Sequence, residues 1–144
     1  MSFLLDTNVV SEWVRPRPDA NVVEWLAEVD EDQVFMSVIS FAELRRGVDL
    51  LPAGLRRDGL ERWVVDDLAA RFDGRVLDVD RPVADAWGRI TARSRRAGHT
   101  LGAMDAFFAA TAETHELTLV TRNVRDFEGL GISIFNPWES SQTE

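Results

Sequence analysis

The sequence predicts an α/β fold in which a central parallel sheet of four to five strands lies between two layers of helices, an α/β/α arrangement. Short apolar segments of strand length alternate along the chain with longer segments whose apolar residues recur at helical spacing. The first short segment, residues 3–5, is entirely apolar, as expected for a strand buried on both faces of a parallel sheet. The chain has 144 residues, of which 45% are hydrophobic, so it is large enough for one domain with its own core.

In the first half of the chain, helix signals surround one further strand. A short helix over residues 9–14 stops at the Arg-Pro-Arg-Pro sequence of residues 15–18, and Asp19 caps the next helix, which extends to about Val29. Residues 34–37 are uncharged and mostly apolar, so we expect the second strand there, followed at once by a helix that begins near residue 38. Pro52 breaks that pattern, and a long amphipathic helix then extends to Phe72.

The second half contains three more strand segments. Residues 75–79 are the third, after which Asp80 caps a helix that carries Pro82 in its first turn and ends near Gly98. A strongly apolar helix begins at residues 102–105, and residues 117–121 and 132–135 are the fourth and fifth strands. We expect one domain over residues 1–137 and a polar tail over residues 138–144.

Composition excludes several classes of protein. The chain has no cysteine, which rules out Cys-ligated zinc, a thiol nucleophile and a disulfide framework. It has no glycine-rich dinucleotide motif or P-loop, and it lacks the lysine that a receiver-type phosphoacceptor domain requires. Asp78 and Asp80 have the spacing of a haloacid-dehalogenase motif, but a strand end followed by a helix cap explains them better. No apolar run is long enough to span a membrane and no signal peptide is evident, so we expect a cytoplasmic protein.

The charge distribution bears on nucleic-acid binding in two ways. The net charge of −9 argues against a general nucleic-acid binder, because neutralising phosphates requires clustered cations. All 16 basic residues are arginine, however, and arginine makes planar two-point contacts to phosphate. Arg89, Arg93 and Arg96 are spaced along one predicted helix and are candidates for phosphate contacts, as is Arg122. Ordinary solvated helix faces are the alternative explanation for these clusters.

Acidic side chains recur where the predicted strands end. Asp6 directly follows the first strand, where it either caps a helix or belongs to a site at the carboxyl edge of the sheet. Glu43 lies about one and a half turns into the helix after the second strand. Asp105 lies in a first helical turn, inside the apolar sequence Ala-Met-Asp-Ala-Phe-Phe. Asn123 and Asp126 follow the fourth strand.

These acids predict a metal site. Burying an ionised carboxylate is costly unless a cation or hydrogen-bond donors compensate, and the helix dipole at Asp105 offsets only about 1 kcal/mol or less. Several carboxylates that converge without basic partners raise one another's pKa until a metal binds. Oxygen ligands select Mg²⁺ or Mn²⁺, and such sites serve phosphoryl chemistry.

The chain resembles the PIN-domain ribonucleases, and among them the VapC toxins of toxin–antitoxin pairs, including their FitB-like subclass. The resemblance extends from residue 1 to about residue 137. It depends on the order and spacing of four segments, each weak alone. These segments are Leu5-Asp6-Thr7-Asn8, residues 37–47 with Ser40 and Glu43, Asp105 with the Ala/Phe-rich helix after it, and Leu119-Val120-Thr121-Arg122-Asn123 with Asp126-Phe127.

The resemblance implies that Asp6, Glu43 and Asp105 form the acidic metal core, with Thr7, Asn8, Ser40 and Thr121 supporting it. The family's fourth acid falls at Asn123, where this chain has an amide, and Asp126 is the possible substitute. The resemblance further implies a Mg²⁺- or Mn²⁺-dependent endoribonuclease that acts on structured RNA such as tRNA or rRNA. It also implies a homodimer and a VapB-like antitoxin that blocks the acidic pocket with an arginine and carries the complex to DNA.

Asn123 keeps a second interpretation open. With an amide in place of the fourth acid, the chain is alternatively a catalytically weak interaction protein that acts with its antitoxin as a DNA-bound repressor of its own synthesis. Loss of metal-dependent RNA cleavage upon substitution of Asp6 or Asp105 distinguishes the two interpretations.

Overall fold

The first strand, β1 (Phe3–Leu5), occupies the centre of a five-stranded sheet of order β3-β2-β1-β4-β5. The computed structural model describes residues 1–139, and every strand pair in it is parallel. Leu4 lies opposite Phe35 of one neighbouring strand and Leu119 of the other. The predicted α/β class and parallel sheet are confirmed, with five strands. The other four strands are β2 (Val34–Ser37), β3 (Val76–Leu77), β4 (Thr118–Val120) and β5 (Ile134–Phe135).

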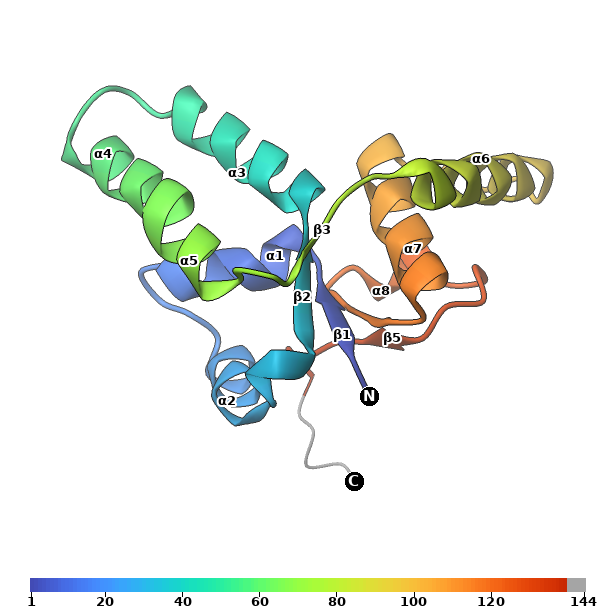
Figure 1. Cartoon of the computed structure of the whole chain (residues 1–144), viewed down its shortest axis with the longest axis horizontal. Coiled ribbons are helices and arrows are strands. Elements are labelled where there is room, and N and C mark those ends of the chain that lie inside the picture. The colour runs from blue at the N-terminus through green and yellow to red at the C-terminus, as the bar shows by residue number, and fades with distance from the viewer. Residues whose placement is uncertain (140–144) are drawn as a thin grey trace.

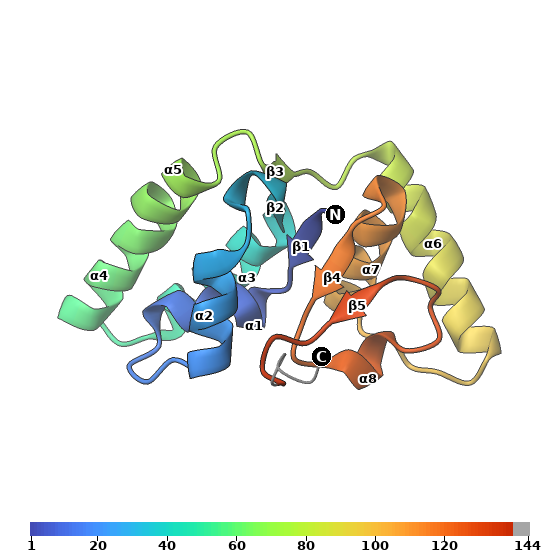
Figure 2. The same cartoon turned by 90° about the horizontal axis from the view of Figure 1, so that it is seen from below.

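Helices cover both faces of the sheet, with α1, α2, α4 and α5 on one side and α6 and α7 on the other (Figures 1 and 2). The first group comprises α1 (Thr7–Val10), a 3₁₀ turn (Ser11–Val14), α2 (Ala20–Glu28), α4 (Leu55–Arg62), a π-helical segment (Trp63–Leu68) and α5 (Ala69–Arg71). The second group comprises α6 (Arg81–Arg96) and α7 (Ala103–His115), with the short α8 (Val124–Phe127) after β4. A 3₁₀ turn (Glu31–Gln33) precedes β2, and α3 (Val38–Leu50) follows it.

Each face of the sheet has its own apolar core, as the alternation of side chains along a strand requires. Leu4 packs into a cluster with Ile90 and Phe108 from α6 and α7, and all three are at most 1% exposed. The next residue, Leu5, packs into the opposite cluster with Val10 and Phe72, each fully buried. The predicted three-layer arrangement is therefore confirmed, because Leu4 and Leu5 of one strand are buried under helices on opposite faces of the sheet.

The N-cap predictions are confirmed. The Asp19 carboxylate accepts the backbone N–H groups of Asn21 and Val22, and the Asp80 carboxylate accepts that of Val83 at 3.2 Å. The Asp80 bond also supports the strand-end and cap interpretation of the Asp78–Asp80 pair over a phosphatase motif.

Some predicted boundaries are wrong. The strands expected over 75–79, 117–121 and 132–135 are only two or three residues long. A strand ends where pairing with the adjacent strand ends, whereas the apolar run in the sequence continues further. The helix expected over 9–14 begins at Thr7, directly after its cap. The helix expected to extend to Phe72 is present, with a π-helical segment in its middle, which periodicity does not reveal.

The chain beyond the last strand returns to the first half of the molecule. The Trp138 ring packs against the Leu5 side of the core, and its carbonyl oxygen accepts a hydrogen bond from Asn21 Nδ2 at 3.0 Å. The remainder of the expected polar tail, residues 140–144, lies outside the described residues. In the described part of the chain, no helix is both long and apolar enough to cross a membrane.

Candidate functional site

The candidate site lies at the carboxyl ends of β1 and β4, the two adjacent strands at the centre of the sheet. From β1 the chain continues to β2 on one side, and β4 pairs with β1 on the other, so the strand order reverses here. Open parallel sheets place ligands at such a reversal. Asp6 follows β1, and Thr121 follows β4.

Asp6 serves both of the roles considered from its sequence. Its Oδ1 accepts the Thr7 backbone N–H at 2.7 Å and so caps α1. Its Oδ2 accepts the Thr121 hydroxyl at 2.8 Å and, more weakly, Asn8 Nδ2 at 3.4 Å. Although Asp6 is only 5% exposed, it has no cationic partner among residues 1–139.

Burial raises the pKa of Asp6 to about 6, and the negative charges of Asp105 and Glu43 add to the rise. The hydrogen bonds from Thr121 and Thr7 lower the pKa but do not offset the burial. Asp105 and Glu43, predicted from two other segments, are thus close enough to Asp6 to disfavour its ionisation.

Thr7 connects two of these acids. Its N–H donates to Asp6, and its hydroxyl donates to Glu43 Oε1 at 2.5 Å. Ser40 Oγ lies 2.8 Å from the Thr7 hydroxyl oxygen. Because that hydroxyl has one hydrogen and gives it to Glu43, the fully buried Ser40 is the donor of the second bond. The supporting positions of Thr7 and Ser40 expected from the sequence thus form a single chain of hydrogen bonds that fixes Glu43.

Asp105 lies in the first turn of α7, as predicted, and is half-buried. Burial raises the pKa of Asp105, followed by the charges of Asp126 and then Glu43. Asp126 is therefore part of the same electrostatic group, although its sequence position alone did not decide this.

Asn123 contributes its backbone to the site. Its N–H donates to the Thr121 hydroxyl oxygen at 3.0 Å, so this hydroxyl accepts from Asn123 while it donates to Asp6. The Asn123 side chain is exposed and makes no capping bond to α8. Asp126 thus acts on Asp105 by charge, whereas the backbone of Asn123 fixes the loop that orients Asp6. Which of the two fills the family's fourth position stays a prediction.

The donor atoms suit a hard divalent cation, but the ligands are not preassembled. Among the described residues, no three His, Cys, Asp or Glu side chains lie close enough together to hold an ion. Asp105 and Glu43 nevertheless act on Asp6 by charge, and Glu43 acts on Asp105, so the metal core of Asp6, Glu43 and Asp105 stays a prediction. Mg²⁺ keeps several waters and needs only one or two carboxylates, so the oxygen-only donor set fits Mg²⁺ or Mn²⁺ chemically.

Comparisons with known proteins identify the family and agree with the fold. The chain matches the PIN domain over residues 3–131. It is 40% identical to toxin FitB of Neisseria gonorrhoeae, an alignment that covers 94% of this chain and 97% of FitB. The chain is 30% identical to the tRNA(fMet)-specific endonuclease VapC of Shigella flexneri, covering 91% and 93%. Among solved structures, FitAB bound to the IR36 DNA fragment superposes with a TM-score of 0.91 at 37% identity, covering 96% of this chain and 97% of that one. The chain belongs to the PIN-domain family, among the VapC toxins.

The predicted RNA-binding arginines of this PIN domain fall into two groups. Arg89 and Arg93 form ion pairs with acids of α6 and α7. The Arg89 guanidinium bonds Asp85 at 3.0 Å and Glu113 at 3.2 Å, and that of Arg93 lies 3.8 Å from Glu113. With Arg96 they line a surface recess on α6. Arg122 instead lies beside the acids, and its backbone N–H approaches Asn8 Oδ1 at 3.5 Å. The solvated-face explanation describes Arg89 and Arg93 well, whereas Arg122 lies next to the site.

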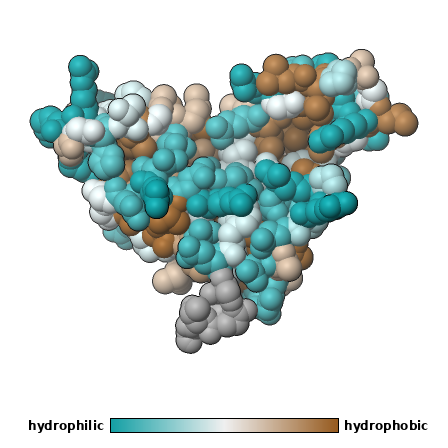
Figure 3. All heavy atoms as spheres, turned by 180° about the vertical axis from the view of Figure 1, so that it is seen from behind, coloured by the Kyte–Doolittle hydropathy of each residue, from teal (hydrophilic) through white to brown (hydrophobic). Residues whose placement is uncertain are grey.

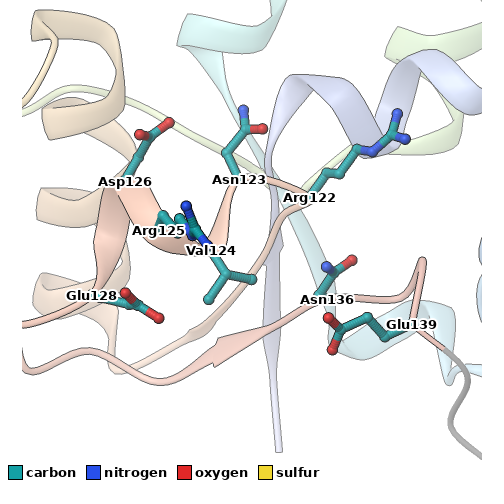
Figure 4. A pocket seen from close by; sticks show the side chains of 8 residues that line it. All are labelled: Arg122, Asn123, Val124, Arg125, Asp126, Glu128, Asn136 and Glu139. Atoms are coloured by element: carbon teal, nitrogen blue, oxygen red, sulfur yellow. The ribbon is translucent and has the colours of Figure 1, made fainter.

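Two features of this PIN domain were missed by sequence reasoning. One is a recess of about 470 Å³ beside the acids, lined by residues after β4 and after β5 (Figure 4). The other is a groove of about 290 Å³ that has Glu43 in its wall and is otherwise mainly apolar, with Leu44, Leu60 and Trp63 from α3 and the helix after it. Both cavities are formed by segments that are distant in sequence, so local patterns do not reveal them. The only sequence signal for the groove was the amphipathic pattern through residue 72.

Proposed function

We propose that this PIN domain is the toxin of a type II toxin–antitoxin pair and acts as a Mg²⁺- or Mn²⁺-dependent endoribonuclease on structured RNA, such as tRNA or rRNA. The observation that carries the proposal is the buried Asp6 at the centre of the sheet edge, which has no cationic partner among residues 1–139 and whose pKa is raised by burial and by the charges of Asp105 and Glu43. A polyanion would be repelled by such a group, so its use in phosphodiester hydrolysis requires a cation.

The chain's own residues fix the groups that would hold this cation. Asp6, Glu43 and Asp105 are the proposed ligands, with Asp126 as the fourth acid acting on Asp105. Thr121 and Thr7 hold the two oxygens of Asp6 in place, and Thr7 also holds Glu43. When bound, the cation supplies a hydroxide nucleophile at neutral pH and neutralises charge on the phosphate.

The antitoxin is the proposed partner. The solved FitAB relative is bound to DNA, and we propose that this chain likewise forms a homodimer and reaches DNA only through a VapB-like antitoxin. The net charge of −9 favours a basic partner whose arginine enters between Asp6, Glu43 and Asp105. The apolar groove beside Glu43 suits an amphipathic segment of that partner, and hydrophobic atoms gather over the α3–α4 end of the molecule in Figure 3.

Cleavage of total tRNA and rRNA in Mn²⁺ or Mg²⁺ tests the proposed function. We expect discrete fragments from the wild type that disappear in Asp6→Ala and Asp105→Asn. The exposed Asp32→Asn serves as a control that keeps full activity. Equal cleavage by all four proteins would identify a contaminating nuclease and refute the site.

One observation favours the second candidate, the catalytically weak interaction protein. The position of the family's fourth acid holds Asn123, and the acids do not form a ready cage among the described residues. Thermal melting separates the candidates. For a nuclease, Asp105→Asn stabilises the metal-free protein by removing repulsion and abolishes its stabilisation by Mn²⁺. Melting that is unchanged in both conditions favours the interaction protein.

A further inference from the structure

The recess beside the acids, here named the β4–β5 recess, is formed by two segments that the sheet brings together. Arg122, Asn123, Arg125 and Asp126 come from the loop after β4 and from α8. Asn136 comes from the segment after β5. Figure 4 shows Arg122 and Asn123 on one side of the opening, with Asn136 and Glu139 facing it from the neighbouring segment.

The recess adjoins the group that orients Asp6. Thr121, whose hydroxyl donates to Asp6 at 2.8 Å, immediately precedes Arg122. The Asn123 N–H bonds the same hydroxyl. The wall of the recess therefore begins at the residue that follows the group orienting Asp6.

Arg122 is held in position without being neutralised. Its guanidinium lies over the Trp138 ring, 5.3 Å from the ring centroid, a cation–π contact that limits its motion. Among residues 1–139, neither Arg122 nor Arg125 forms an ion pair with an acid, in contrast to Arg89. A cation that is oriented but unpaired, next to four mutually repelling acids, suits a phosphate of an incoming strand.

The remaining lining groups can bind the edge of a base. The Asn136 Oδ1 accepts the Trp138 backbone N–H at 2.9 Å, which leaves its Nδ2 donor directed elsewhere. Asn123 adds an exposed amide with a donor and an acceptor. Three acids, Asp126, Glu128 and Glu139, also line the recess and would repel a bare phosphate, but they accept hydrogen bonds from exocyclic amino groups of bases.

We propose that the β4–β5 recess binds an unstacked nucleotide adjacent to the cleaved phosphodiester, with Arg122 contacting its phosphate and Asn136 reading its base. The inference rests on the proposed function, since it extends that site to part of its RNA specificity. Sequence-specific RNA recognition commonly uses such splayed nucleotides, because their base edges are free.

The test is RNA affinity, measured by fluorescence anisotropy with a labelled RNA hairpin that has a mixed-sequence loop, in Ca²⁺. We expect Arg122→Gln to weaken binding about tenfold, as befits a charge-assisted hydrogen bond. It should also lower the slope of log affinity against log salt by about 0.7, the value for one phosphate contact on a single strand. Arg122→Lys, which keeps the charge but loses the planar fork, should lose less affinity.

The matched control is Arg95→Gln, which removes an exposed arginine from α6 and should change affinity by less than about twofold. Asn136→Ala should reduce discrimination among the four bases at one loop position without changing the salt slope. Arg122→Gln should change the slope without changing that discrimination. Melting curves of all variants confirm folding.

Equal affinity and salt slope for wild type and Arg122→Gln would overturn the inference, as would an equal loss in Arg95→Gln. Weaker capture of the antitoxin by Arg122→Gln at unchanged RNA affinity would make the recess a protein contact and would also overturn it. If the wild type binds the hairpin through Arg122 yet cleaves no RNA with any metal, the nuclease proposal fails, and with it the placement beside a cleaved bond, while binding of a nucleotide in the recess stands.

Discussion

Replacing Asp6 by asparagine tests the electrostatic account of the site through protein stability. The pKa of Asp6 is raised from 3.8 to about 6, so the folded state binds a proton more tightly than the unfolded state. The stabilisation of the folded state by this bound proton is fully present below about pH 4 and is lost as the pH rises through about 6. A shift of about two units corresponds to about 3 kcal/mol across this window.

About half of this pH-dependent loss of stability falls between about pH 5 and about pH 7.5. Between about pH 5 and about pH 7.5, linkage with these two pKa values gives a loss of about 1.4 kcal/mol for the wild type. The amide introduced by Asp6→Asn does not titrate, so this variant should lack this part of the pH dependence. The asparagine also loses an acceptor for Thr7, Thr121 or Asn8, which lowers stability by a constant amount of about 1–3 kcal/mol that cancels in the comparison between pH values.

The assay is urea unfolding of the metal-free wild type, Asp6→Asn and the exposed control Asp32→Asn at both pH values. The stability difference between wild type and Asp6→Asn should change by about 1.4 kcal/mol from one pH to the other, and that of the control should not. A constant difference between wild type and Asp6→Asn would refute the inference that Asp6 is buried at a cost, and with it the reason for a cation.

Other residues give further tests. Thr7→Val removes the hydroxyl that donates to Glu43 and accepts from Ser40, so it should abolish cleavage and lower the free energy of unfolding in urea by about 1–3 kcal/mol. Thr7→Ser should retain both activity and stability. Full activity in the valine variant would contradict the hydrogen-bond chain. Phe108→Ala empties a core position that is 1% exposed and should lower the free energy of unfolding by about 3–5 kcal/mol, and a loss under about 1 kcal/mol would be inconsistent with that packing. Ser94 carries a buried hydroxyl without a hydrogen-bond partner among the described residues, so Ser94→Ala should leave the urea midpoint unchanged or raise it; a marked decrease would reveal an unrecognised partner.

The fold could be predicted because its signals are local. The apolar runs at residues 3–5 and 34–37 and the caps Asp19 and Asp80 depend on a few neighbouring side chains, and the structure places them as predicted. Strand ends were less accurate, because the end of a strand depends on where its neighbour stops. The π-helical segment at Trp63–Leu68 changes the hydrogen bonding of a helix without changing its apolar pattern.

The site could be predicted in part for the same reason. Parallel strand ends meet at one edge, so Asp6 and Thr121 had to be neighbours once the strand order was known. The roles of Arg89 and Arg122 could not be distinguished in this way. Arg89 is occupied by Glu113, which lies on another helix, and Arg122 meets Trp138 only because the chain returns after β5. Such contacts depend on three-dimensional packing and leave no periodic trace in the sequence.

Mn²⁺ binding at neutral pH tests the central claim most directly, because the account requires the acids to share one cation. Titration calorimetry of the metal-free protein should show binding by the wild type and by Asp32→Asn, and a loss of affinity of at least about tenfold in both Asp6→Asn and Asp105→Asn. At about pH 6, binding should also release about half a proton per ion, because Asp6 is then about half protonated. Equal Mn²⁺ affinity in all four proteins, with no proton release, would contradict the claim that these carboxylates form the metal site.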